Sequence, residues 1–460
     1  MLSRTCACVL TAVLLFAQPA RRTVALVMTG GVVVTMDAGG RVLSPGALAI
    51  DGRDIVAVDS PDAIAARFTG RDTIDAAGQV VMPGLINTHT HAPMVLYRGL
   101  ADDLALMEWL QKYIFPAEAK TVTPEFVRAG TRLAALEMIQ SGTTTYADMY
   151  YFEEEIAKVT KEAGLRGVLG QTIIQFPVAD AKTPAEGLAR TEAFLTQFAG
   201  DDLIVPAIAP HSMYTLDTRT LKAVRAMADR THAPVLIHLA ETADEIRTSR
   251  GQHKATPVQY LESIGFWGPR TLAAHGVWLT ASDMAILARR HVSVSHNPES
   301  NMKLASGTAK VVALGRAGVV VGLGTDGAAS NNDLDMFEAM RQAAFLAKLQ
   351  TSDPRAVPAR TALAMATIDG ARALGMDREL GSIEAGKRAD VIAVSMMAPR
   401  QTPMYDPLSH LVYTTRGDDV RTTIVNGRVL MRDRHVLTLN ETAVLSEARA
   451  LAEKVRAAVR

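Results

Sequence analysis

PGLINTHTH, residues 83–91, is a short apolar run that ends in two histidines separated by one residue. Because side chains alternate along a β-strand, His89 and His91 point to the same side and can bind one metal ion together. A histidine pair with this spacing also arises by chance or in a protein core. It becomes strong evidence for a metal site at the carboxyl end of a barrel strand, where barrel enzymes place their chemistry.

The chain around this run has the pattern of such a barrel, because short apolar runs alternate with amphipathic segments of helical length. Eight runs are predicted strands: Val80 to Asn87, Thr143 to Asp148, Arg166 to Ile173, Leu203 to His211, Pro234 to His238, Thr271 to His275, Val292 to His296 and Val319 to Asp326. Four segments are predicted helices: Val127 to Ile139, Leu188 to Phe198, Leu221 to Thr231 and Met336 to Leu349. We therefore expect an α/β fold with a (β/α)8 TIM barrel.

The two ends of the chain share a different texture of short β-rich runs broken by glycines. These runs lie between Val24 and Val58 and again between Ala389 and Leu430, and we expect them to pair into one small β-sandwich. The predicted domains are therefore a β-sandwich from residues 22–79 and 385–440, a barrel from residues 80–384, and a C-terminal helix from residues 441–460.

Residues 1–20 resemble a secretory signal peptide, with Arg4 before an apolar run and Gln18-Pro19-Ala20 after it. Cleavage there would make the protein periplasmic or secreted. The alternative is an extended tail or a misassigned start, which would leave the protein in the cytoplasm. The run is too short to cross a membrane, and no other stretch approaches the roughly 18 apolar residues that a span requires.

The charge balance of the 460 residues argues against nucleic acid and acidic membranes as partners, because Lys plus Arg and Asp plus Glu both total 48. A small-molecule substrate is the expected partner. Cys6 and Cys8 are the only cysteines, so the body of the protein has no disulfide framework and no thiolate site. Any metal ion must use histidine and carboxylate ligands.

Further polar residues end other predicted strands. His238 ends the fifth strand and Glu241 follows it, while His275 ends the sixth strand. Asp326 ends the eighth strand after an almost wholly apolar run, and a buried carboxylate there needs a cation or several hydrogen bonds. Any one of these residues could be an ordinary polar cap, but their joint position at the functional end favours a metal site.

Together these residues resemble the ligand set of the amidohydrolases, and the resemblance extends from Val24 to Arg434. PGLINTHTH, HNPESNMKL (residues 296–304) and GTDGAASNN (residues 324–332) look like the branch that contains 5-methylthioadenosine/S-adenosylhomocysteine deaminases. Triazine hydrolases and guanine-type deaminases are near neighbours. The resemblance implies one divalent metal ion, held by four residues: His89, His91, His238 and Asp326. Zinc suits this ligand set, with iron or manganese as alternatives.

The resemblance also implies the catalytic and substrate-binding residues. Asp326 would accept a proton from the metal's water ligand, His275 would orient the nucleophile or stabilise developing charge, and Glu241 would protonate the ring nitrogen of the substrate. Glu241 and Asp326 would thereby contact the substrate. Trp109 would pack on a purine, Glu118 would accept both ribose hydroxyls, and His211 would contact the adenine ring. Without the resemblance, Trp109 as a core anchor and Glu118 as a solvated helix residue are equally weighted alternatives. For His211 the alternative to substrate contact is a hydrogen-bonded residue behind the ligands.

Two positions depart from the family pattern. Relatives that act on S-adenosylhomocysteine place an arginine near the end of the third strand, where this chain has Gln171. An amide cannot bind a carboxylate as a guanidinium does, which favours 5-methylthioadenosine or adenosine as substrate. Met213 replaces a common proline.

His296, at the end of the seventh strand, is expected either to touch substrate or to cap the following turn.

The leading hypothesis is a hydrolytic deaminase that converts an adenosine-type nucleoside to its inosine analogue and ammonia. One alternative is a deaminase or chlorohydrolase of another N-heterocycle, such as a triazine, pterin or guanine. An alternative of another class is a catalytically silent, metal-free paralogue that serves as a binding module, although the intact ligand set argues against it. A homo-oligomer is expected from the resemblance.

Overall fold

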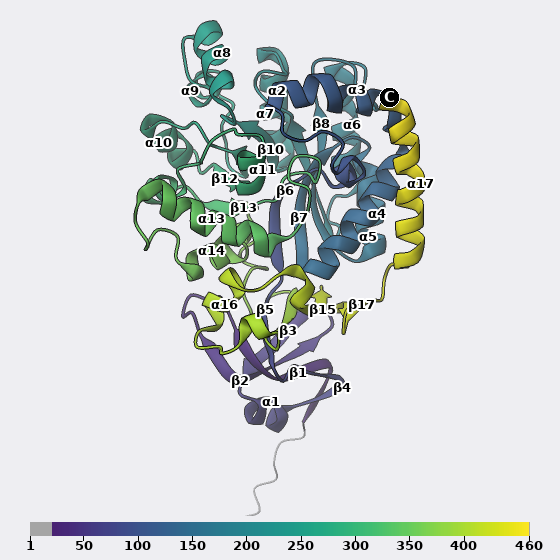
Figure 1. The fold of residues 1–460 in the computed structure, drawn as a ribbon, viewed down its shortest axis with the longest axis vertical. Helices are drawn as coiled ribbons and strands as arrows, with labels where there is room; N and C mark the ends of the chain where they lie inside the picture. Colours follow the sequence, from purple (N-terminus) through teal and green to yellow (C-terminus); the bar gives the residue numbers. More distant parts are fainter. Residues whose placement is uncertain (1–20, 460) are drawn as a thin grey trace, which may run out of the picture.

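The computed structural model describes residues 21–459 (Figure 1), so the predicted signal peptide lies outside the described residues. The described chain forms a barrel and a separate sheet built from both ends of the chain, as predicted (Figure 1). No helix of the described residues has the length and apolar character needed to cross a membrane.

The barrel contains eight parallel strands whose order in the sheet follows their order in the chain. They are β6 (Leu85–Thr90), β7 (Thr143–Tyr150), β8 (Arg166–Ile173), β9 (Ile204–Pro210), β10 (Val235–Leu239), β11 (Thr271–His275), β12 (Ser293–His296) and β13 (Val321–Leu323). The last strand returns to the first, because the backbone N–H of Asp326 donates to the carbonyl of His89 at 2.9 Å. The predicted TIM-barrel fold is therefore confirmed.

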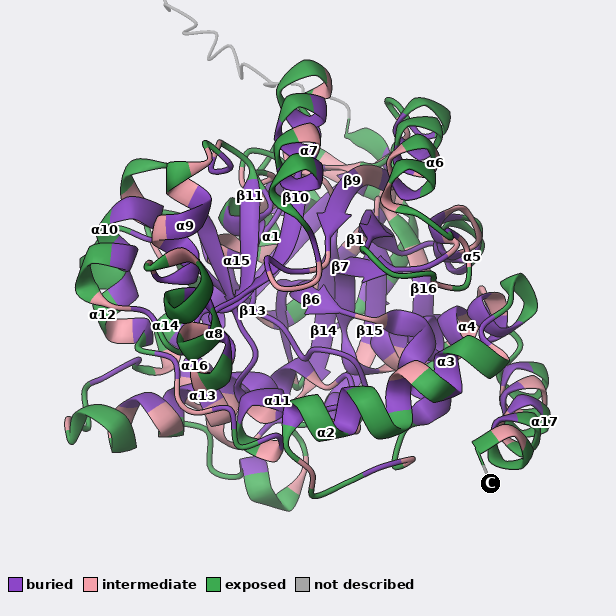
Figure 2. Cartoon of the chain, turned by 90° about the horizontal axis from the view of Figure 1, so that it is seen from above, coloured by how far each residue is buried: buried purple, intermediate pink, exposed green. Residues whose placement is uncertain are grey.

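Helices surround the barrel, with buried faces toward the strands and exposed faces outward (Figure 2). They are α4 (Pro124–Ser141), α5 (Glu153–Ala163), α6 (Pro184–Gln197), α7 (Thr218–Thr231), α8 (Ala243–His253), α9 (Pro257–Ser263), α10 (Ala281–Arg289), α11 (Pro298–Lys303), α12 (Val311–Arg316), α13 (Met336–Thr351), α14 (Ala359–Met365) and α15 (Ile368–Ala373). The four predicted helices correspond to α4, α6, α7 and α13, which begin up to four residues earlier than expected.

The terminal segments form one mixed nine-stranded sheet. Its strands are β1 (Arg22–Val34), β2 (Val42–Asp51), β3 (Asp54–Asp59), β4 (Phe68–Asp75), β5 (Gln79–Pro83), β14 (Val391–Ser395), β15 (Val420–Val425), β16 (Arg428–Arg432) and β17 (His435–Val436). Strands from both ends contribute to one apolar core, which includes Leu48, Ile50, Val391 and Ile424. The short helices α1 (Pro61–Arg67) and α16 (Pro407–Tyr413) and the single turns η3 (Pro399–Gln401) and η4 (Gly417–Asp419) complete these segments.

The expectation of one strand from Val80 to Asn87 is wrong. Residues 79–83 form β5, which pairs with β14 in the terminal sheet, and the barrel strand β6 begins only at Leu85. The chain passes between the two sheets at Gly84, where an added Cβ would lie 2.2 Å from the side chain of Thr144. The last barrel strand is also shorter than expected, since β13 covers only Val321–Leu323, and Asp326 beyond it has a left-handed backbone with φ of 65°.

Two further helical segments matter for the site. The mouth of the barrel is covered by η1 (Ala92–Tyr97), α2 (Leu106–Trp109), the π-helical turn η2 (Leu110–Ile114) and α3 (Phe115–Thr121). The C-terminal helix α17 (Glu441–Val459) runs along α4 and reaches α3 (Figure 1). Its buried residues, Val444, Ala448, Leu451 and Val455, recur every three or four positions and so form one apolar face.

Candidate active site

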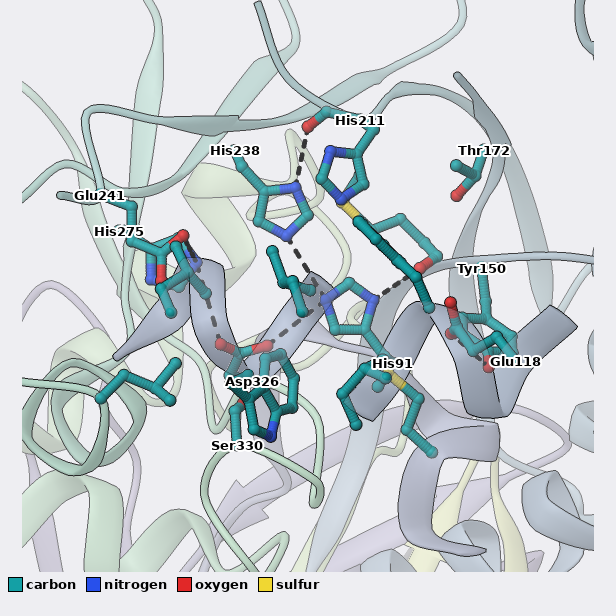
Figure 3. Close-up of a pocket in the computed structure, with 18 of the residues that line it drawn as sticks. His91, Glu118, Tyr150, Thr172, His211, His238, Glu241, His275, Asp326 and Ser330 are labelled. Carbon is teal, nitrogen blue, oxygen red and sulfur yellow. Dashed lines mark hydrogen bonds and ion pairs between the residues drawn. The ribbon is translucent and has the colours of Figure 1, made fainter. Parts of the chain in front are cut away.

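All of the predicted site residues except His89 line one pocket at the carboxyl ends of the barrel strands (Figure 3). The pocket has a volume of about 580 Å³, including its open mouth. Polar groups gather at its two ends, and apolar side chains line the wall between them. Its lining includes His91, Trp109, Glu118, Tyr150, Thr172, His211, His238, Glu241, His275 and Asp326.

The four predicted metal ligands converge at the deep end of this pocket. Asp326 Oδ1 lies 3.4 Å from His89 Nε2 and 3.4 Å from His91 Nε2. His238 Nε2 lies 3.4 Å from His91 Nε2. Nε2 of His89 is buried and has no hydrogen-bond partner among the described residues. A divalent cation would satisfy this nitrogen, so the donor set fits a metal ion. His275 also lies close enough to His89 and His238 to belong to such a cluster.

Backbone carbonyls fix the orientation of two of these rings. Nδ1 of His91 donates to the carbonyl of Met149 at 2.7 Å, and Nδ1 of His238 donates to the carbonyl of His211 at 2.8 Å. Each ring therefore presents Nε2 to the centre of the cluster. Burial lowers the pKa of His89, His91 and His238, that of His89 to about 4, so all three imidazoles are neutral at neutral pH. Neutral imidazole is the form that binds metal.

Asp326 is held as a carboxylate. Ser300 Oγ donates to its Oδ2 at 2.7 Å, and the backbone N–H of Gly327 donates to its Oδ1 at 2.7 Å. Burial by itself would raise the pKa of Asp326. The close approach of His89 Nε2, together with the neighbouring His275 and His91, outweighs burial and holds this pKa well below its usual range.

Two predicted catalytic residues lie beside Asp326. His275 Nε2 is 3.8 Å from Asp326 Oδ2 and 3.8 Å from Glu241 Oε2. The other ring nitrogen of His275 lies 3.0 Å from Asn301 Oδ1, which fixes the ring. Burial raises the pKa of Glu241. Burial would lower the pKa of His275, but the charges of Glu241 and Asp326 outweigh burial, so this pKa is also raised. The arrangement therefore places two groups with raised pKa values, Glu241 and His275, beside Asp326, whose pKa is lowered.

Glu245 and Tyr150 were not predicted from the sequence. Glu245 accepts hydrogen bonds from the backbone N–H groups of Ala240 and Glu241, both at 2.9 Å, and so positions Glu241. In the sequence it looks like an ordinary acid in the first turn of a helix. Tyr150 stands in the run Met-Tyr-Tyr-Phe, which looks like protein core. A polar residue directly after a barrel strand was the signal that could have identified it.

The opposite end of the pocket is built around Glu118. Its Oε1 accepts a hydrogen bond from the Tyr150 hydroxyl at 2.7 Å. Burial raises the pKa of Glu118 to about 7. Trp109 is buried in the adjoining wall, and its indole N–H has no partner among the described residues. The ring of His211 lies 4.7 Å from that of His238, measured between ring centres, so His211 stands beside the predicted metal ligands.

Gln171 does not line the pocket, whereas its neighbour Thr172 does. The side chain of Gln171 is fully buried and its amide donates to Asp180 Oδ2 at 2.8 Å. Met213 and His296 are buried but also lie outside the pocket lining. Of the two expectations for His296, contact with substrate is therefore the less supported. The pocket lining, which lies wholly within the described residues, contains neither lysine nor arginine.

Known proteins resemble this chain over nearly its whole length. The model of the amidohydrolase family matches residues 80–430. A protein of Syntrophobacter fumaroxidans named 5-methylthioadenosine/S-adenosylhomocysteine deaminase is 47% identical over 431 residues, which cover 94% of this chain and 98% of that protein. A 5'-deoxyadenosine deaminase of Methanosarcina acetivorans is 46% identical, with 94% and 98% covered. The crystal structure of an adenosine deaminase from Xanthomonas campestris with bound zinc superposes with a TM-score of 0.94 at 40% identity, covering 95% of this chain and 100% of that one.

Proposed function

The chain belongs to the amidohydrolase family, and from this premise we propose that it is a metal-dependent deaminase that releases ammonia from the adenine ring of a nucleoside. One observation carries the proposal. A single pocket has a cluster of metal-ligand type at its deep end and the acceptor pair of Glu118 at the other (Figure 3). The metal-ligand cluster suits hydrolysis of the exocyclic C–N bond of a purine, and the Glu118 carboxylate suits a ribose.

Zinc is the proposed metal ion, held by His89, His91, His238 and Asp326. Three neutral imidazole nitrogens and one carboxylate oxygen are ligands that zinc commonly takes, and the similar adenosine deaminase of Xanthomonas campestris has zinc bound. Iron and manganese accept the same donors. Bound here, the ion would supply a water molecule acidic enough to act as a nucleophile at neutral pH.

The chain's own residues would move the protons. Asp326 is ionised, so one of its carboxylate oxygens can accept the proton of the attacking water. Glu241 has a raised pKa, so its carboxyl group can donate a proton to the ring nitrogen beside the attacked carbon and then transfer one to the departing amine. His275 Nε2, 3.8 Å from both carboxylates, can donate a hydrogen bond to the developing charge.

Glu118 would bind the ribose. A carboxylate offers only acceptors, and one oxygen of Glu118 already receives the Tyr150 hydroxyl. The two vicinal hydroxyls of a ribose are donors that match the remaining lone pairs. Trp109 and His211 would contact the purine between Glu118 and the metal ligands, since both line the pocket.

The substrate is proposed to carry a small uncharged group at its 5' position. The acids of the pocket lining are Glu118, Glu241 and Asp326, and no lysine or arginine lines it. The amino-acid carboxylate of S-adenosylhomocysteine would find no cationic partner there. The lack of a cationic side chain in the pocket lining therefore favours 5-methylthioadenosine, 5'-deoxyadenosine or adenosine as substrate. Gln171 itself does not contact the pocket, because its amide donates to Asp180.

Ammonia release by the zinc-loaded protein tests the proposal. The panel contains 5-methylthioadenosine, 5'-deoxyadenosine, adenosine, S-adenosylhomocysteine, guanine and a triazine, with Asp326→Asn as the inactive control. Turnover of the uncharged nucleosides that disappears in the variant is expected. Turnover of guanine or the triazine alone would support the other heterocycles, and absence of both bound metal and turnover would support the silent paralogue. The homo-oligomer and the exported location stay predictions, which light scattering and sequencing of the mature N-terminus test.

A further inference from the structure

Two carboxyl groups with no catalytic role assigned above lie buried beside the pocket. Asp148 stands near the end of β7 and Glu153 opens α5, and both are 0% exposed. The two carboxyl groups contact each other. No lysine or arginine among the described residues forms an ion pair with either one. Two buried carboxylates without a cation are energetically unfavourable, so such a pair needs another reason to persist.

Asp148 holds the backbone next to a predicted metal ligand. Its Oδ1 accepts a hydrogen bond from the N–H of Ala92 at 2.6 Å, and Ala92 directly follows His91. The residue after Asp148 contributes the carbonyl of Met149, which receives the Nδ1 proton of His91. His91 is therefore held from two sides by one short stretch of β7. Displacing this stretch would change where His91 points its Nε2.

Glu153 holds the backbone of the residue that supports the opposite end. Its Oε1 accepts a hydrogen bond from the N–H of Tyr150 at 2.7 Å. The hydroxyl of the same tyrosine donates to Glu118 at 2.7 Å. Figure 3 shows Tyr150 beside Glu118 at one end of the pocket, and His91 between that end and the ligands His238 and Asp326. The pair Asp148–Glu153 is thus connected to both ends.

The oxygens of Asp148 and Glu153 that do not bind backbone N–H groups indicate how many protons the pair holds. Asp148 Oδ2 and Glu153 Oε2 are buried and receive no hydrogen bond from any other described residue. Burial raises the pKa of Asp148 to about 7, and burial together with the charge of Asp148 raises the pKa of Glu153 well above its usual range. The other charged group that affects Glu153 is Glu154, also an acid. One proton between the two facing oxygens satisfies both.

We propose that Asp148 and Glu153 form a buried acid pair bridged by one proton, which positions the metal ligand His91 through Ala92 and the ribose acceptor Glu118 through Tyr150. Both are positioning residues. The Glu118 end of the inference rests on the proposed function, whereas the His91 end requires only that the cluster binds metal. Through the pair, one short stretch of β7 sets the distance between the two ends of the pocket.

Amide substitutions test the shared proton. Each single variant, Asp148→Asn or Glu153→Gln, keeps the acceptor for its backbone N–H and supplies an N–H toward the other carboxylate. The double variant places two NH2 groups face to face with nothing to accept their hydrogens. For metal-free protein we expect each single variant to unfold within about 3 °C of the wild type, and the double variant to lose at least about 5 °C more than the sum of the two. Glu125→Gln, an exposed acid on α4, is the control.

Alanine substitutions test the two ends separately. Asp148→Ala frees the N–H beside His91, so zinc affinity, measured by competition with a chromogenic chelator, is expected to fall about 10-fold or more. Glu153→Ala frees the N–H of Tyr150, so KM for 5-methylthioadenosine is expected to rise with kcat nearly unchanged, and Glu153→Gln should restore KM.

The outcomes distinguish this inference from the proposed function. Additive effects in the amide double variant would overturn the shared proton. If Asp148→Ala and Glu153→Ala lower zinc affinity equally and raise KM equally, the division of roles between the two ends of the pocket would be overturned. Unfolding temperatures and zinc affinities that follow the expectation, in a protein that deaminates no nucleoside, would leave the acid pair standing and overturn the proposed substrate.

Discussion

Replacing Glu118 by glutamine is expected to stabilise the protein at alkaline pH and to weaken its action on nucleosides. The substitution keeps the size of the side chain and an oxygen that can accept the Tyr150 hydroxyl. It removes a carboxylate that is only 8% exposed. If Glu118 binds substrate at a cost in stability, the Glu118→Gln variant should be both more stable and less active on nucleosides.

The size of the stability effect follows from the pKa of Glu118. Burial raises it from the ordinary value of 4.5 to about 7. Between these two pH values the unfolded chain releases the proton while the folded protein keeps it, so the free energy of unfolding of the wild type falls as the pH rises. At about 1.4 kcal/mol per pKa unit the loss is about 3 kcal/mol, fully present above pH 7 and absent below 4.5. A weaker hydrogen bond from Tyr150 to an amide offsets about 1 kcal/mol. The net gain for Glu118→Gln at pH 8 is then about 2 kcal/mol.

The effect on nucleosides has the opposite sign. Hydrogen bonds from two ribose hydroxyls to a carboxylate contribute about 1.5–3 kcal/mol each, and an amide preserves part of this. We expect kcat/KM for adenosine to fall about 10- to 100-fold, and for 2',3'-dideoxyadenosine to change less than threefold.

Denaturant unfolding of metal-free wild type and variant at pH 4.5 and pH 8 measures the first effect, and ammonia release at pH 8 measures the second. Glu108→Gln is the matched control, because Glu108 is 43% exposed on neighbouring α2 and pairs with Lys112 at 2.9 Å. A variant less stable than wild type at pH 8 would refute the argument from burial. An equal loss for both nucleosides would refute the assignment of Glu118 to the ribose.

Other changes have expected outcomes that follow from the same geometry. Removing the metal with a chelator should abolish ammonia release and lower the unfolding temperature, and zinc should restore both; an unchanged unfolding temperature would contradict a metal site in the barrel. Asp326→Asn should reduce ammonia release by at least about 10³-fold, because it removes both a metal ligand and the proton acceptor. Glu245→Gln should lower kcat about 10-fold at unchanged zinc content, since it loosens the backbone of Glu241; an unchanged kcat would argue against this positioning role. Deleting residues 441–460 should raise KM more than it lowers kcat, because α17 packs against α3, which carries Glu118; the kcat-to-KM split of the truncated protein checks this.

The barrel was predictable because its strands are apolar runs with polar ends. β8 and β11 have the predicted bounds, since their neighbours in the chain break the apolar pattern clearly. The error at Val80 to Asn87 has a physical cause. Both halves of this run are buried strands, and their division at Gly84 depends on the close approach of Thr144, which is distant in sequence. Hydrophobic pattern records burial but not which sheet buries a residue.

The candidate site was predictable only in part. His89, His91, His238 and Asp326 end barrel strands, and strand ends of a barrel must meet in space. Trp109 and Glu118 came only from the family resemblance, because α2, η2 and α3 are short and reach the pocket by tertiary packing. Glu245, Asp148 and Glu153 act through hydrogen bonds to backbone groups, and Tyr150 acts through a hydrogen bond to the side chain of Glu118. Sequence does not show which backbone N–H a buried acid will meet.

The terminal sheet has a consequence for how the protein is made. In this sheet β5 lies between β1 and β14, which come from opposite ends of the chain. On the ribosome, β1 to β5 emerge first, and one edge of β5 stays unpaired until the entire barrel and β14 have been synthesised. A chain whose translation stops early keeps an open apolar edge and exposes Val80 and Met82, which are buried in the finished protein. Pairing of β5 with β14 therefore requires that the whole barrel has been synthesised, and aggregation or proteolysis is the expected fate of a chain that stops before β14.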